Sequence, residues 1–106
     1  MITYEEWAKD AEVVKKYTGG MRQSVDIWVM PDGTELAEHT RFAGFLSSLK
    51  VETIVQIPFP LNHSGDFDCE MVEGEDEGLW FPVFRGDDSL KLAYNFVKDY
   101  RETMED

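Results

Sequence analysis

The sequence predicts an α+β fold: a small single domain of residues 1–106, with a mostly antiparallel sheet of about four strands and N-terminal, middle and C-terminal helices. Apolar residues recur at helical spacing near both ends and near the middle of the chain, and they alternate with polar residues in the segments between. Glycine and proline separate these segments. The chain has 106 residues, 42% of them hydrophobic, which suffices for one core.

The first helix is predicted between Thr3 and Tyr17. Thr3 and Glu6 have the spacing of a capping box, and Gly19 with Gly20 can end the helix. One helical face of this segment carries its apolar residues, which are Tyr4, Trp7, Ala8, Ala11 and Val14.

A strand and a tight turn are predicted next. Residues 25–30 alternate between the two sides of an extended segment, with Val25, Ile27 and Val29 on one side and Asp26, Trp28 and Met30 on the other. Pro-Asp-Gly at 31–33 favours a turn, because proline presets its backbone angle and glycine accepts a positive φ. Residues 34–36 would complete a short hairpin.

A second helix is predicted to begin between Thr34 and Thr40 and to run to Leu49. Its apolar residues at helical spacing are Phe42, Ala43, Phe45, Leu46 and Leu49. Residues 51–57 then alternate as a strand, which the prolines at 58 and 60 close.

Two further strands and a last helix complete the predicted fold. Residues 66–71 and 79–84 are expected to be extended, joined by a loop over 72–78 that contains two glycines. Residues 88–104 are expected to form the C-terminal helix, with apolar positions at Leu92, Ala93, Phe96, Val97 and Tyr100.

Acidity is concentrated in the second half of the chain. The formal net charge is −12, and residues 1–50 hold 8 acidic and 6 basic residues whereas residues 51–106 hold 14 and 4. No basic residue lies between Lys50 and Arg85. Seven carboxylates stand within residues 66–77, a segment that we call the acidic hairpin: Asp66, Asp68, Glu70, Glu73, Glu75, Asp76 and Glu77.

These carboxylates predict a partner with a basic surface. A strongly acidic chain repels nucleic acid and anionic lipid, so direct binding to nucleic acid or to a membrane is not expected. We expect a non-enzymatic inhibitor that occupies the basic, nucleic-acid-binding surface of another protein, as a DNA mimic. Phage anti-defence proteins and nuclease immunity proteins are analogous in charge and size. The predicted partner-binding residues are the seven carboxylates of the acidic hairpin and Trp80.

Three other interpretations of the acidic and aromatic residues remain open. The acidic hairpin can be a solvated surface that only maintains solubility. A calcium site is the second interpretation, because Asp66, Asp68 and Glu70 offer the oxygen ligands that calcium prefers, although Met71 stands where a calcium loop has glycine. An accessory or adaptor module could bind a partner, or a second copy as a homodimer, through an aromatic sheet face that holds Trp28, Ile54, Trp80 and Phe84.

No catalytic residue, metal ligand or cofactor motif is predicted. Cys69 stands between two carboxylates, which disfavour its thiolate, and His39 and His63 have no motif around them. A site built from carboxylates alone remains the enzymatic alternative. The N-terminus lacks the pattern of a signal peptide and no apolar run is long enough to span a membrane, so a cytoplasmic location is expected.

Overall fold

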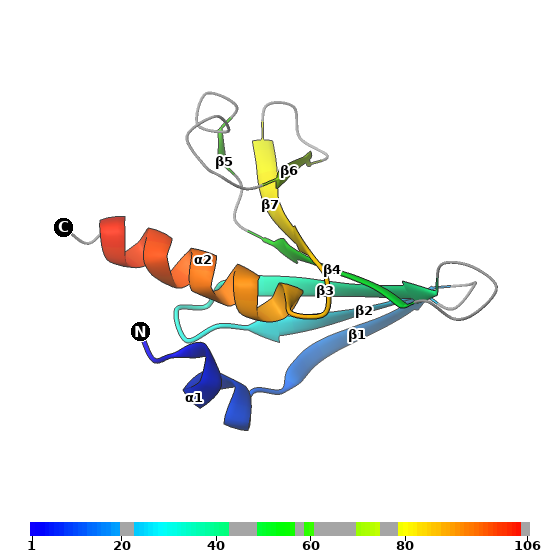
Figure 1. Ribbon diagram of the computed structural model, residues 1–106, viewed down its shortest axis with the longest axis horizontal. Helices are drawn as coiled ribbons and strands as arrows, with labels where there is room; N and C mark the ends of the chain where they lie inside the picture. The colour runs from blue at the N-terminus through cyan, green and yellow to red at the C-terminus, as the bar shows by residue number, and fades with distance from the viewer. Residues whose placement is uncertain (20–22, 43–48, 57–58, 61–69, 75–78, 105–106) are drawn as a thin grey trace.

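The structure, a computed structural model, describes residues 1–19, 23–42, 49–56, 59–60, 70–74 and 79–104. These residues form a small α+β domain with two helices and seven strands (Figure 1). In chain order the elements are α1 (Tyr4–Asp10), β1 (Val13–Gly19), β2 (Gln23–Val29), β3 (Glu35–Phe42), β4 (Leu49–Val55), β5 (Phe59–Pro60), β6 (Glu70–Glu73), β7 (Leu79–Arg85) and α2 (Ser89–Met104). The α+β class and the helices near both ends are confirmed, but the sheet exceeds the predicted four strands.

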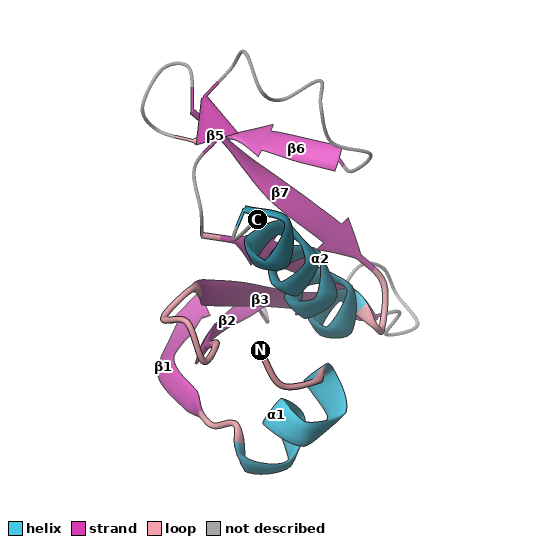
Figure 2. Cartoon of the chain, turned by 90° about the vertical axis from the view of Figure 1, so that its left-hand side faces the viewer, coloured by secondary structure: helices cyan, strands magenta, loops and turns pink. Residues whose placement is uncertain are grey.

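All strands join one antiparallel sheet. Six of them follow the order β1-β2-β3-β4-β7-β5, and β6 pairs with β7 outside this path. A register shift between Val13 and Lys15 interrupts the ladder of β1 with β2. Figure 2 shows α2 almost end-on, inside the curve that β1–β3 and β7 form.

Both helices pack on the same face of the sheet. The buried core joins one residue of α1, three residues of α2, the residue that follows β2 and two residues of β3 and β4: Trp7, Ala93, Tyr94, Val97, Met30, Leu36 and Val55. Five of these residues have no exposed surface, and burial between the helices and the sheet is the main stabilising contribution available to so small a domain.

The first helix is shorter than predicted. Thr3 caps it as expected, because its Oγ1 accepts a hydrogen bond from the Glu6 N–H at 3.2 Å. However, α1 ends at Asp10, Ala11 is extended, and residues 13–19 form β1. Helical spacing placed Val14 on the apolar face of the helix, but Val14 is 54% exposed on β1.

Strand pairing explains why the helix stops early. The segment after α1 contains β-branched residues, which restrict side-chain rotation in a helix and favour strands. Each residue pair of β1 with β2 adds backbone hydrogen bonds that a solvent-exposed helix end would not gain, and Lys16 Nζ lies 3.7 Å from Asp26 Oδ1.

The predicted turn after β2 is confirmed. Gly33 has a φ of +92° and donates its N–H to the Met30 carbonyl at 2.9 Å. Asp32 Oδ1 accepts a hydrogen bond from the Thr34 N–H at 2.9 Å, and Arg101 of α2 donates to Asp32 Oδ2 at 2.9 Å. The turn therefore closes the β2–β3 hairpin and also holds the C-terminal helix.

The middle helix is a wrong prediction. Residues 35–42 form β3, which pairs along its whole length with both β2 and β4. Ladder hydrogen bonds on both sides outweigh the helical spacing of the apolar residues. Leu49 begins β4, and the remaining part of the predicted helix, residues 43–48, lies outside the described residues.

The later elements agree better with the sequence. Strands over 51–57 and 79–84 correspond to β4 and β7, and the last helix corresponds to α2. Only residues 70 and 71 of the predicted strand over 66–71 are described, where they begin β6, and β6 continues into the predicted loop as far as Glu73.

The aromatic face was assigned to the wrong side of the sheet. The Trp28 ring lies 6.0 Å from Trp7 and the Phe84 ring lies 5.6 Å from Phe96, so both residues face the helices. Ile54 lies on the opposite face, because strand residues alternate and its neighbour Thr53 faces α2. Two of the four residues of the proposed adaptor face, Trp28 and Phe84, therefore pack against the core and do not form an exposed surface with Ile54.

A buried hydrogen bond joins the sheet to the start of α2. Thr53 Oγ1 and Ser89 Oγ lie 2.7 Å apart, and both residues are completely buried. A hydroxyl in such a place is costly if it lacks a partner.

We predict that Thr53→Val or Ser89→Ala alone destabilises the fold by about 1–3 kcal/mol, because each leaves one buried hydroxyl unsatisfied. The double variant should be less destabilised than the two single effects added together. Urea unfolding of all four proteins measures this coupling. Thr18→Val, at an exposed strand position, is the control, and additive single effects would contradict the prediction.

Candidate partner-binding hairpin

β6 and β7 form a hairpin at the side of the sheet that carries the acidic residues. β6 pairs with β7 from Glu70, opposite Val83, to Glu73, opposite Trp80. The Gly74 N–H donates to the Leu79 carbonyl at 2.9 Å and continues the ladder towards the turn. In Figure 1, β7 leaves the core sheet beside β4 and rises away from α2, with β5 and β6 near its far end.

The structure describes three of the eight predicted partner-binding residues. Glu70 and Glu73 are exposed on β6, and Trp80 is partly buried on β7. Five lie outside the described residues: Asp66, Asp68, Glu75, Asp76 and Glu77.

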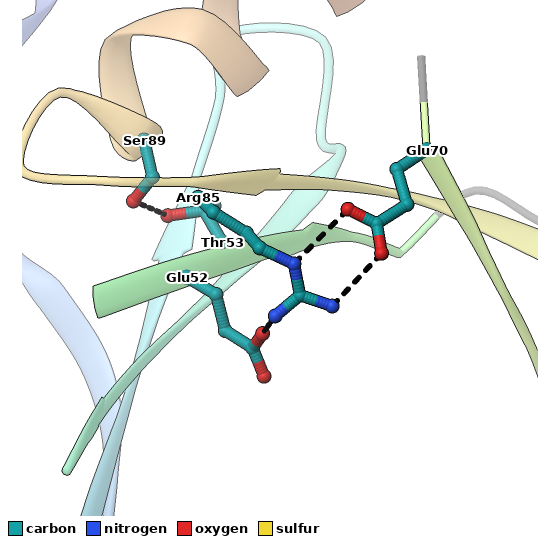
Figure 3. A network of polar contacts seen from close by, with 5 residues as sticks. All are labelled: Glu52, Thr53, Glu70, Arg85 and Ser89. Atoms are coloured by element: carbon teal, nitrogen blue, oxygen red, sulfur yellow. Dashed lines mark hydrogen bonds and ion pairs between the residues drawn. The ribbon is translucent and has the colours of Figure 1, made fainter. Parts of the chain in front are cut away.

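Glu70 is paired with Arg85, the first base after the acidic hairpin. The Arg85 Nε and Nη2 atoms donate to the two carboxylate oxygens of Glu70, each at 3.0 Å, and Nη1 donates to Glu52 of β4 (Figure 3). One guanidinium thus links three neighbouring strands. Two parallel hydrogen bonds fix the geometry of such a pair better than a single contact does.

The ion pair changes the titration of Glu70. The hydrogen bond from Arg85 lowers the pKa of the Glu70 carboxyl below its ordinary value of 4.5. The hydrogen bond to Glu70 also raises the pKa of the Arg85 guanidinium. Both side chains are more than half exposed, at 56% and 52%, so water screens the attraction and the pair contributes little to global stability.

Trp80 is partly buried at the point where β7 meets two other strands. Its backbone pairs with Glu73 of β6 and with Phe59 of β5. The indole Nε1 is buried and has no hydrogen-bond partner among the described residues. Trp80 is therefore part of the packing between these strands, and only part of its side chain is exposed to a partner.

Gly74 is required by close packing at the end of β6. A β-carbon at this position would lie 2.3 Å from Cε2 of the Phe81 ring, far inside van der Waals contact. The backbone at position 74 can therefore lie this close to the Phe81 ring only because glycine has no side chain.

The charge around the hairpin stays strongly negative after this pairing. Residues 66–85 contain seven carboxylates and one base, a net charge of −6. Because Arg85 is already bound to Glu70 and Glu52, that base is committed to strand contacts. The net negative charge of this segment can attract cations to the hairpin.

Sequence reasoning missed the pairing of Arg85 with Glu52 and Glu70. The three residues are 15 and 33 positions apart along the chain, and only the strand register brings them together. The sequence feature that could have indicated this pairing is the position of Arg85, the first basic residue after a long stretch without any. Arg85 is therefore the basic residue nearest in sequence to the acids before it.

Neither a cluster of metal ligands nor a membrane-spanning helix occurs in the described part of the chain. No group of three or more His, Cys, Asp or Glu residues there could hold a metal ion. Neither of the two described helices is long and apolar enough to cross a membrane. Comparison with protein-family models, with curated proteins and with solved structures gave no match to the chain.

We predict that Arg85→Gln loosens β6 while leaving the core sheet unchanged. Amide hydrogen exchange at residues 70–73 should become roughly two- to fivefold faster, because a solvent-screened ion pair contributes only modestly to local stability. Exchange in β2 and β3 should not change. Lys98→Gln is the control, because it removes an exposed ion pair with Glu102 in α2, far from the hairpin in sequence.

The same pair predicts a pH dependence. Because the folded-state pKa of Glu70 is lowered, the pair contributes stability above the unfolded-state pKa near 4.5 and loses it as the pH falls through the folded-state pKa. NMR titration should find the Glu70 pKa below 4.5 in the natural protein and closer to 4.5 in Arg85→Gln. The lowered pKa of Glu102, which Lys98 binds, should stay the same in both proteins.

Proposed function

We propose that this protein is a small, acidic, non-enzymatic inhibitor that binds the basic surface of a nucleic-acid-binding protein. One observation carries the proposal: the sole base in residues 66–85 is bound to two carboxylates, so six negative charges of this segment lack a base within it. Like charges that are held together without counterions repel each other, and a cationic partner relieves that repulsion.

Pairing with β7 gives β6, the described part of the acidic hairpin, a rigid support. A mimic of DNA needs dense negative charge on a rigid support, since the duplex carries about one charge per 1.7 Å of its axis. β6 is tied to β7 by a backbone ladder and by the two-fold contact of Glu70 with Arg85.

The two described carboxylates then have different roles in the proposed contact. Glu70 holds β6 to β7 through Arg85, whereas Glu73 is exposed to solvent. Together with Asp66, Asp68, Glu75, Asp76 and Glu77, Glu73 would meet lysine and arginine side chains of the partner. Inhibitors of this charge and size act for phages against defence systems or neutralise nuclease toxins, and we place the protein in this functional class.

The test neutralises four carboxylates of the acidic hairpin and leaves Glu70 in place. A tagged variant with Asp68→Asn, Glu73→Gln, Asp76→Asn and Glu77→Gln is used in a pull-down from lysate of the organism that makes the protein. The natural protein should retain a nucleic-acid-binding protein that rising salt or added duplex DNA releases, because steering and contact are electrostatic. The variant should retain at least tenfold less of it.

A matched control separates local from overall charge. Glu6→Gln, Asp10→Asn, Glu12→Gln and Glu35→Gln remove the same number of charges from exposed positions in α1, β3 and the segment after α1. This variant should bind the partner as the natural protein does. Equal binding by both variants, or a partner that resists salt and ignores DNA, would contradict the proposal.

A further inference from the structure

A pocket of about 420 Å³ lies at one end of the sheet, away from the acidic hairpin in sequence. Its walls come from the start of β2, the end of β3, the start of β4 and the connection from β7 to α2. The volume falls in the range of pockets that hold small molecules, about 300–1,000 Å³. Two of its lining residues, Glu52 and Arg85, belong to the ion-pair network that holds Glu70, but the proposed inhibitor function does not account for the lining residues of β2 and β3.

The strand register brings polar side chains of the pocket together. Gln23 pairs with Arg41, Val25 pairs with His39, and His39 pairs in turn with Glu52. Because alternate residues share a face, the side chains of Gln23, His39 and Arg41 start from the same face of neighbouring strands. Their backbone positions are separated by about 5–8 Å, from the strand spacing to the diagonal between Gln23 and His39. One small ligand can therefore reach all three donors.

The charges of the pocket are uneven along the sheet. Glu52 pairs with His39 in the strand ladder and shares the single charge of Arg85 with Glu70, so these three charged groups together keep a net charge of −1. Arg41 is exposed and forms no ion pair with another described residue. A second carboxylate, Asp87, lines the pocket on the connection from β7 to α2. Arg41 is therefore the charged lining residue on the side of the pocket that β2 and β3 form.

We propose that this pocket binds a small organic anion through a carboxylate or phosphate group. The planar guanidinium of Arg41 would hold two oxygens of that group, since its paired N–H donors match the geometry of either anion. The imidazole of His39 and the amide of Gln23 would donate to the remaining oxygen positions. Val25, which lines the same pocket, offers apolar contact for the body of the ligand.

The experiment is a titration of ¹⁵N-labelled protein, followed by NMR, with inorganic phosphate and separately with benzoate. Either probe at millimolar concentration should shift the amides of residues 23–25, 39–41 and 51–52 in a saturable way. Tighter binding of phosphate would identify a phosphate site, and tighter binding of benzoate a carboxylate site with an apolar wall. No saturable shift with either probe would overturn the proposal.

Variants connect the shifts to the donors. Arg41→Gln should weaken binding of the preferred probe at least tenfold, and His39→Gln should weaken it less. Arg41→Lys should recover only part of the affinity, because lysine keeps the charge but lacks the paired donors. Lys9→Gln, at an exposed position of α1, is the control for the loss of one positive charge. Unchanged affinity in Arg41→Gln would overturn the proposal even if shifts are seen.

Discussion

Burial of Tyr94 joins the two ends of the chain, and the rest of the domain depends on that contact. The ring is fully buried, its centroid lies 4.9 Å from that of Trp7, and its hydroxyl donates to the Ile2 carbonyl at 2.6 Å. The Trp7 indole in turn donates to the Val29 carbonyl at 3.1 Å. Since α1 has only seven residues and would not persist alone in water, these contacts with α2 and β2 keep it folded. The helix layer then covers the face of the sheet that carries Leu36 and Val55.

Local signals in the sequence predicted the parts of the fold that local chemistry determines. The cap at Thr3, the turn around Gly33 and the long helix near the C-terminus all lie where the sequence indicates. The errors concern β1, where apolar residues recur at a helical period but the backbone is extended, and β3, which occupies the predicted start of the middle helix. In these segments the conformation depends on pairing with strands elsewhere in the chain, and the sequence of one segment does not show which strand it pairs with. The misplaced face of Trp28 has the same origin, because either side of an alternating strand can turn towards the helices.

The candidate site was predicted as a concentration of charge and not as an arrangement of residues. Composition alone gives the acidic segment, since the absence of bases between Lys50 and Arg85 is visible in the chain. The pairing of Glu70 with Arg85 needs the register of β6 on β7 and of β4 on β7, which the sequence does not contain. Likewise no sequence motif surrounds His39, and its place beside Arg41 in the pocket depends on the pairing of β3 with β2 and β4.

The position of β1 at one end of the strand order has a consequence for the behaviour of many copies in solution. Among the described strands β1 pairs with β2 alone, so its outer backbone groups could template the sheet of another molecule. Two lysines at positions 15 and 16, and the register shift beside Val13, are features that hinder such edge-to-edge pairing. Aggregation through the outer edge of β1 is thereby disfavoured.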